Sequence, residues 1–202
     1  MRDYVTLVCG LPRSGTSLLM QMLCAGGVPI FDPDEAAHPF FETRQVRLAR
    51  RWDLDAIGCT AKLLAPSRWP PPKAGRYKFI ITRRNPRQQA RSTAKFLHMG
   101  CTQGRTILLG KPQVREAEIG IKRDQATLES LLAGYDAPVL HVRFKTLVTK
   151  PELVVRDLDA FVGPLDCAAA LERVIPRSPK CLPGMLEHDE LGASLPPWPD
   201  PA

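Results

Sequence analysis

The sequence predicts an α/β fold in which a central parallel sheet is flanked by helices in three layers. Apolar segments at residues 4–9, 78–82 and 139–144 have the composition of buried strands. Segments with helical periodicity alternate with them along the 202-residue chain. Such alternation is typical of parallel sheets whose strands are joined by crossover helices. We therefore expect ligands to bind at the carboxyl ends of the strands.

The first strand and the first helix are predicted on either side of a short loop. The strand over residues 4–9 is almost continuously apolar, as a strand covered on both faces must be. The helix runs from about Thr16 to Cys24 and is ended by the glycine pair at 26 and 27. The apolar side of this helix is made up of Leu18, Leu19, Met22 and Leu23.

Elements in the middle of the chain are separated by proline-rich segments. A loop with three prolines leads to Phe41-Glu42, and a strongly basic helix is expected around residues 46–52. Residues 66–76 are rich in proline and predict an exposed loop before the strand over 78–82. Pro86 suits the first turn of a helix that reaches about His98.

The last third of the chain predicts two more helices and a strand. A surface helix is expected over 113–133, a strand over 139–144, and a helix opened by Pro151 and closed by Gly163. Four prolines follow Leu195 and oppose regular structure. We expect one domain over 1–194 and a proline-rich, flexible tail over 195–202.

Charge and composition restrict the classes of function. A hydrophobic content of 44% and a charged content of 24% are ordinary for a globular protein, and the net charge of +7 suits an anionic ligand. The basic residues are spread along the chain and aromatic residues are few, which argues against a nucleic-acid-binding protein. No apolar run approaches the ~20 residues of a membrane span.

The six cysteines are widely spaced and include no C-x-x-C pair, which argues against a zinc site and a dense disulfide framework. Reduced thiols and the lack of a signal peptide predict a cytoplasmic protein. The cysteines are Cys9, Cys24, Cys59, Cys101, Cys167 and Cys181.

The loop between the first strand and helix is the clearest functional motif. Gly10 and Gly15 have the G-x-x-x-x-G spacing of a P-loop, whose backbone N–H groups and helix N-terminus suit a phosphate or sulfate group. A nucleotide triphosphatase would continue with Lys and Ser/Thr, whereas this chain has Thr16-Ser17 and carries its cation inside the loop, as Arg13. This change favours a phosphorylated donor other than ATP.

A second candidate anion site follows the strand over 78–82. The chain continues as Arg84-Asn85-Pro86, and Ser92 lies about two turns into the next helix. Arginine offers a planar fork for phosphate oxygens and serine offers one hydroxyl donor. Taken alone, an arginine-rich helix start is more often a solvated face.

Together the two segments resemble the sulfotransferases that use 3′-phosphoadenosine 5′-phosphosulfate (PAPS), especially small bacterial or phage-type members. Residues 11–17 (LPRSGTS) resemble the 5′-phosphosulfate loop of that family, and Arg84-Asn85-Pro86 with Ser92 resembles its 3′-phosphate element. A supporting match covers residues 141–147 (HVRFKTL), where Lys145-Thr146 replaces an acidic pair of the family. No counterpart is found for the family's C-terminal Arg-Lys-Gly element.

The resemblance implies a P-loop NTPase-like fold and in-line transfer of a sulfuryl group from PAPS to a hydroxyl or amine acceptor, without a metal. Arg13 would stabilise the leaving 5′-phosphate oxygen, and Glu42 would act as the general base, with Glu35 and His38 as alternatives. Glu42 could instead be a helix N-terminal acid. The residues implied to bind the donor are Arg13, Ser14, Gly15, Thr16, Ser17, Arg84 and Ser92.

Two other functions are compatible with these motifs. An atypical P-loop nucleotide or small-molecule kinase would require ATP and magnesium, and the missing lysine after Gly15 counts against it. A non-catalytic module would bind 3′-phosphoadenosine 5′-phosphate (PAP) or sulfated glycans without transferring a group. The acceptor and the oligomeric state are not identified by the sequence.

Replacing Glu42 by Gln should lower transfer to a hydroxyl acceptor by about 10²–10⁴, because the shape is kept and the base is lost. Donor binding should not change. Rates of transfer from PAPS are the measurement. Normal turnover in Glu42→Gln, together with a loss in Glu35→Gln or His38→Ala, would assign the base to another residue.

Overall fold

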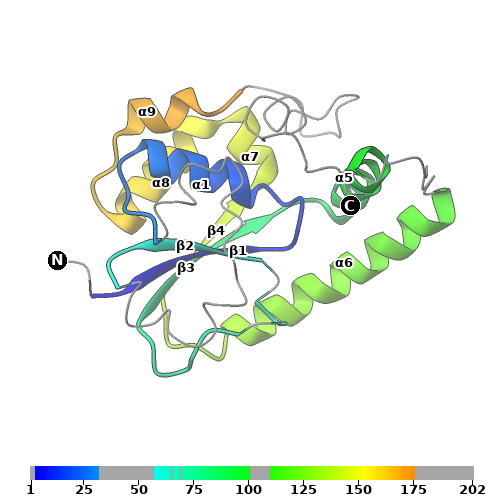
Figure 1. The fold of residues 1–202 in the computed structure, drawn as a ribbon, viewed down its shortest axis with the longest axis horizontal. Coiled ribbons are helices and arrows are strands. Elements are labelled where there is room, and N and C mark those ends of the chain that lie inside the picture. The colour runs from blue at the N-terminus through cyan, green and yellow to red at the C-terminus, as the bar shows by residue number, and fades with distance from the viewer. Residues whose placement is uncertain (1–2, 32–56, 65, 69, 101–109, 176–202) are drawn as a thin grey trace, which may run out of the picture.

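The computed structural model describes residues 3–31, 57–64, 66–68, 70–100 and 110–175. Within these ranges, four strands form one parallel sheet in the order β2-β1-β3-β4 (Figure 1). The strands are β1 (Val5–Gly10), β2 (Thr60–Leu64), β3 (Tyr77–Arg83) and β4 (Val139–Arg143). The helices are α1 (Thr16–Ala25), α5 (Pro86–Gly100), α6 (Lys111–Leu132), α7 (Phe144–Thr149), α8 (Pro151–Val162) and α9 (Cys167–Glu172).

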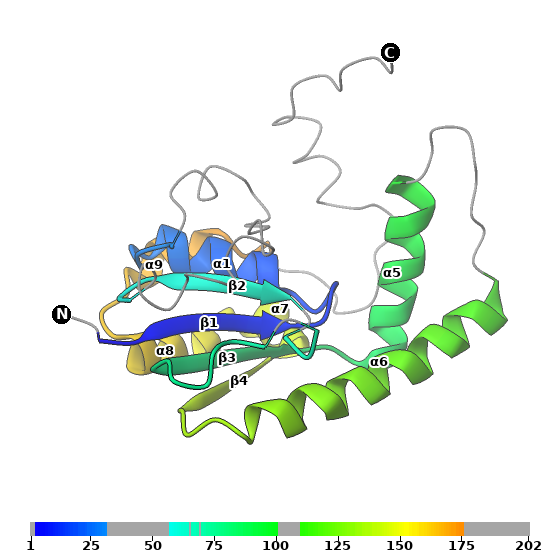
Figure 2. The same ribbon diagram turned by 60° about the horizontal axis from the view of Figure 1, so that its bottom comes forward.

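Helices cover both faces of the sheet, so the predicted three-layer α/β fold is confirmed. Helices α1, α7, α8 and α9 lie on one face and α6 lies on the other (Figures 1 and 2). Alternate residues of the strands enter two apolar cores: Val8 and Ile80 face the first, whereas Leu7 and Phe79 face the second. Leu128 and neighbouring residues of α6 close the second core.

Helix α5 stands beyond the carboxyl edge of the sheet and packs against α6 (Figure 2). The central strands β1 and β3 end at this edge, and the chain turns from them into α1 and α5. The loop after β1 and the segment after β3 therefore lie side by side, which is the arrangement that parallel sheets use for ligand binding.

The predicted elements in the described ranges are confirmed with small shifts in their boundaries, whereas one strand and the two short helices α7 and α9 were missed. The strand predicted over 4–9 is β1, and the strand predicted over 139–144 ends before Phe144, which begins α7. The missed strand is β2, whose short apolar run is interrupted by Lys62. The basic helix around residues 46–52 and the tail over 195–202 lie outside the described residues.

The described residues of the 66–76 segment lack regular structure, but they are not all exposed as predicted. Pro66 and Pro71 are buried. The Tyr135 hydroxyl donates to the Pro71 carbonyl at 2.5 Å, which fixes the segment to the second core. Burial raises the pKa of this phenol, and the neighbouring Cys9 contributes to the shift. Burial also raises the pKa of the Cys9 thiol, which keeps it protonated as an apolar core group.

Two lysines fix helix ends at the amino edge of the sheet. Lys78 donates to the Phe161 carbonyl at the end of α8 at 2.8 Å, and its ammonium lies 4.3 Å from the centre of the Tyr4 ring. Lys73 donates to the Gly134 carbonyl after α6 at 2.8 Å. A cation is favourable at the negative end of a helix dipole, so both lysines stabilise the fold at the edge opposite the loop motif.

Candidate functional site

The loop after β1 lies so close to its neighbours that both of its glycines are required. A Cβ at Gly10 would collide with Thr82 Oγ1 and would lie 2.6 Å from Ser14 Oγ. Gly15 has a φ of +104°, and a Cβ there would lie 2.7 Å from the Phe144 ring. Packing against β3 and α7 therefore explains the glycine spacing that the sequence shows.

Arg13 is held in a strained backbone conformation at the tip of this loop. Its φ of 67° lies in the left-handed region, which is unfavourable for a residue with a side chain. Its Nε donates to Ser92 Oγ at 3.3 Å, and its guanidinium lies 5.0 Å from the centre of the Phe96 ring. The loop thus directs its one arginine toward α5.

Ser14 faces the sheet. Its hydroxyl pairs with that of Thr82 at 2.7 Å in a buried contact, and its N–H donates to the Leu11 carbonyl at 3.2 Å. Both polar groups of Ser14 therefore hold the loop in its turn and against β3.

The N-terminus of α1 presents N–H groups that no side chain caps. Gly15 is the N-cap residue and makes no side-chain hydrogen bond to the first turn. Thr16 is buried and Ser17 is half-buried at the first two helical positions. Uncapped N–H groups and the positive end of the helix dipole together suit an anion.

A lysine that the sequence analysis missed reaches the same point from β2. Lys62 is 3% exposed, and its Nζ donates to Ser17 Oγ at 3.0 Å. Lys62 is paired with Val8 in the strand register, which directs both side chains to the face covered by α1. A buried lysine in an apolar strand is rare. Had β2 been recognised beside β1, this rarity would have marked Lys62 as a candidate site residue.

The two predicted anion elements are in contact. Arg84 follows β3, and its Nη1 donates to the Arg13 carbonyl at 3.2 Å, across 71 residues of sequence. Its guanidinium lies 4.2 Å from the centre of the Phe144 ring. Ser92 is 5% exposed and holds the Arg13 side chain. The structure therefore brings Arg13, Arg84 and Ser92 together.

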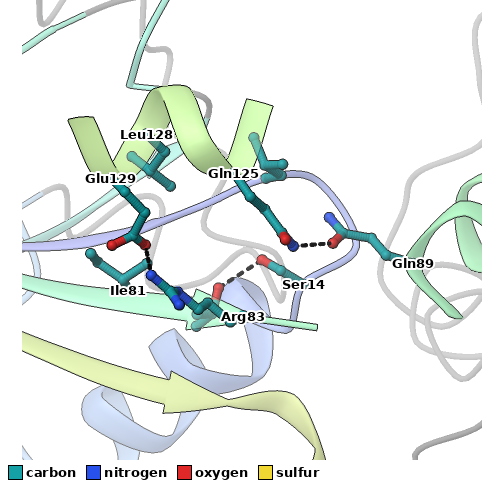
Figure 3. Close-up of a pocket in the computed structure, with 9 residues that line it drawn as sticks. Ser14, Ile81, Arg83, Gln89, Gln125, Leu128 and Glu129 are labelled. Atoms are coloured by element: carbon teal, nitrogen blue, oxygen red, sulfur yellow. Dashed lines mark hydrogen bonds and ion pairs between the residues drawn. The ribbon is translucent and has the colours of Figure 1, made fainter. Parts of the chain in front are cut away.

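A group of polar side chains lies behind the loop, between β3, α5 and α6 (Figure 3). Gln89 Nε2 donates to the Pro12 carbonyl at 2.7 Å. Gln125 Nε2 donates to the Arg84 carbonyl at 3.1 Å and lies 3.4 Å from Gln89 Oε1. Arg83 forms an ion pair with Glu129. None of these contacts was anticipated from the sequence.

The remaining candidate residues fall into two groups. Glu42, Glu35 and His38 lie outside the described residues. Lys145 and Thr146 lie in α7 directly after Phe144, whose ring supports Arg84.

Two general findings concern only the described ranges. They contain no group of three or more His, Cys, Asp or Glu side chains placed to hold a metal ion. No helix in this part of the chain has the length and apolar character needed to cross a membrane.

The site as a whole is cationic. Arg13, Lys62 and Arg84 come from a loop, a strand and a strand end, and they lie around the uncapped N-terminus of α1. Lys62 contacts the start of α1 through Ser17, whereas Arg84 and Ser92 each contact Arg13, Arg84 at the Arg13 carbonyl and Ser92 at its Nε. This arrangement can bind two anionic groups of one ligand.

No protein-family model matches the sequence, and no curated protein matches it. Solved structures do match. A sulfotransferase from Alicyclobacillus acidocaldarius superposes with a TM-score of 0.54 at 14% identity, covering 96% of this chain and 90% of that one. The sulfotransferase domain from the curacin biosynthetic pathway gives 0.53 at 15% identity, covering 98% and 93%.

Retinol dehydratase, in complex with androsterone and the inactive cofactor PAP, gives a TM-score of 0.51 at 14% identity over 86% of this chain. This chain spans only 64% of the length of that protein. The strand order, the helices on both faces and the loop at the end of β1 agree with these likenesses. The chain therefore has the sulfotransferase fold.

Proposed function

We propose that this protein is a sulfotransferase that moves a sulfuryl group from PAPS to a hydroxyl- or amine-bearing acceptor. The observation that carries the proposal is the direct contact of the two anion elements, in which Arg84 bonds the Arg13 carbonyl and Arg13 bonds Ser92. PAPS carries a phosphosulfate at the 5′ position of its ribose and a phosphate at the 3′ position. The loop suits the first group, and Arg84 and Ser92 suit the second. The sulfotransferase fold and the PAP complex of retinol dehydratase support the same donor.

In this proposal the loop side of the site binds the 5′-phosphosulfate. The N–H groups at the start of α1 and the hydroxyls of Thr16 and Ser17 donate to its oxygens. Lys62, beside Ser17, adds a positive charge there. Arg13 stabilises the charge that develops on the bridging oxygen as the S–O bond to the leaving phosphate breaks. The Ser14 hydroxyl is already engaged by Thr82, so we assign Ser14 to holding the loop.

The segment after β3 binds the 3′-phosphate. Arg84 and Ser92 donate to its oxygens, and the Phe144 ring keeps the guanidinium in place. Transfer forms a bond between sulfur and the acceptor oxygen while the donor leaves as PAP. A hydroxyl acceptor must also lose a proton, and Glu42 is the base that we propose. No residue in this proposal requires a metal ion.

We also propose that residues 1–194 form one domain with a flexible tail over 195–202, and that the protein is cytoplasmic. Cys9, Cys24, Cys59 and Cys167 are free thiols, which supports a reducing compartment.

Replacing Arg84 by Ala should remove most of the preference for PAP over AMP. A hydrogen bond from arginine to phosphate contributes roughly 1.5–3 kcal/mol, or about ten- to a hundred-fold in affinity. Calorimetric titration with both nucleotides measures the ratio. Arg87→Ala is the matched control, because Arg87 is exposed one turn away on α5. Equal affinity of the wild-type protein for PAP and AMP would refute the donor assignment.

Replacing Arg13 by Ala should lower turnover about 10²–10³-fold and change donor affinity much less, because its charge acts where negative charge develops. Steady-state rates with PAPS and a panel of acceptors measure the effect. The assay is run in EDTA, where the wild-type enzyme should keep its activity. A raised Michaelis constant with normal turnover would make Arg13 a binding residue, and magnesium-dependent activity would favour a kinase.

Replacing Lys62 by Met should weaken PAP binding about ten-fold. The Lys62 ammonium contacts Ser17 at the start of α1, so its loss removes a positive charge from the place where the phosphosulfate is proposed to bind. The matched control is Lys78→Met, which removes a cation from the negative end of α8. It should cost about 1–2 kcal/mol in the free energy of unfolding and leave PAP binding unchanged.

Chemical denaturation and calorimetry on both lysine variants give the two quantities. If Lys62→Met unfolds more easily and binds PAP normally, then Lys62 is a structural residue.

A further inference from the structure

The two glutamines behind the loop have an arrangement that packing alone does not require. Gln89 is fully buried on α5, and its Nε2 donates to the Pro12 carbonyl at 2.7 Å. Gln125 on α6 uses its Nε2 for two contacts, the Arg84 carbonyl at 3.1 Å and Gln89 Oε1 at 3.4 Å (Figure 3). Carbonyl oxygens only accept hydrogen bonds, so the amide nitrogens must face them, and both side-chain orientations are fixed.

An anion-binding loop creates a need for such donors. A loop that turns its N–H groups toward an anion turns its carbonyl groups away from it, and these need other partners. The Pro12 carbonyl immediately precedes Arg13, and Gln89 supplies its donor. A buried glutamine amide is costly unless it is hydrogen-bonded, and here it is bonded to the loop.

The contacts close a ring that contains both anion elements. Gln89 holds the carbonyl before Arg13, and Gln125 holds the carbonyl of Arg84 and contacts Gln89. Arg84 Nη1 completes the ring by donating to the Arg13 carbonyl at 3.2 Å. Two side chains outside the anion site, Gln89 and Gln125, therefore connect the main chain at Arg13 to the main chain at Arg84.

We propose that Gln89 and Gln125 are positioning residues that set the spacing between the two anion sites. The pair thereby selects a ligand whose phosphate groups are that far apart, as in PAPS and PAP. This inference rests on the proposed function. It predicts a specific loss: without the pair, each anion site still binds one phosphate group, but the two sites no longer fit one ligand together.

The test compares ligands that carry both phosphate groups with ligands that carry one. PAP, AMP and adenosine 3′-phosphate are titrated calorimetrically into Gln89→Met and Gln125→Met, well below the unfolding temperature of each variant. Methionine keeps the length of the side chain and removes its donors. Gln88→Met on α5 and Gln113→Met at an exposed position of α6 are the matched controls.

Gln89→Met and Gln125→Met should each lose about ten-fold in PAP affinity relative to both single-phosphate ligands, and the variant that combines the two substitutions should lose no more than either one. The two controls should keep the wild-type ratios. Unchanged ratios in Gln89→Met would overturn the proposal. An equal loss for all three ligands would overturn it as well, because that is the effect of a merely structural residue.

Hydrogen exchange of the ligand-free protein separates failure of this inference from failure of the proposed function. Peptides that cover residues 10–18 should exchange faster in Gln89→Met than in Gln88→Met. The reason is that the Pro12 carbonyl of the loop has lost its hydrogen bond from Gln89. Absence of PAP binding by the wild-type protein would remove the proposed donor but leave this comparison intact. Equal exchange in the two variants would then show that Gln89 does not hold the loop.

Discussion

The site depends on how closely the 10–15 loop approaches β3 and α7. Gly10 lies against Thr82, and Gly15 lies against the Phe144 ring, so the loop cannot widen without opening the core. The same Phe144 ring supports Arg84, which follows β3. The Phe144 ring thus contacts both anion elements. Because Phe144 begins α7, the start of this helix sets the position of the loop and of Arg84. Tight packing turns two distant sequence segments into one rigid surface.

This rigid surface brings three cationic side chains together. Arg13 has a strained φ, Lys62 is buried beside the positive end of α1, and Arg84 bonds a carbonyl of the loop. The strained φ and the place of Lys62 both go against local preferences. Local rules that are broken without a structural gain are typical of functional sites.

The sequence was informative where chemistry is local and uninformative where it depends on distant pairing. The spacings of Gly10 to Gly15 and of Arg84 to Ser92 lie within single segments, and both were recognised. Lys62 was missed because β2 is short and the lysine interrupts its apolar run, so its place beside β1 follows only from the register. Gln89 and Gln125 are 36 residues apart, and glutamines on helices usually face solvent. The contact of the Ser14 hydroxyl with Thr82 could not be predicted either, because the two residues are 68 positions apart in the sequence.

The lysines at the amino edge have a consequence for how this protein can be changed. Lys73 and Lys78 bond helix ends there, whereas the cations of the site lie at the opposite edge, one strand length away. Substitutions at Lys73 or Lys78 therefore act at the end of the sheet away from the candidate site. They offer a way to change how firmly α6 and α8 are anchored without altering a residue of the loop or of the segment after β3.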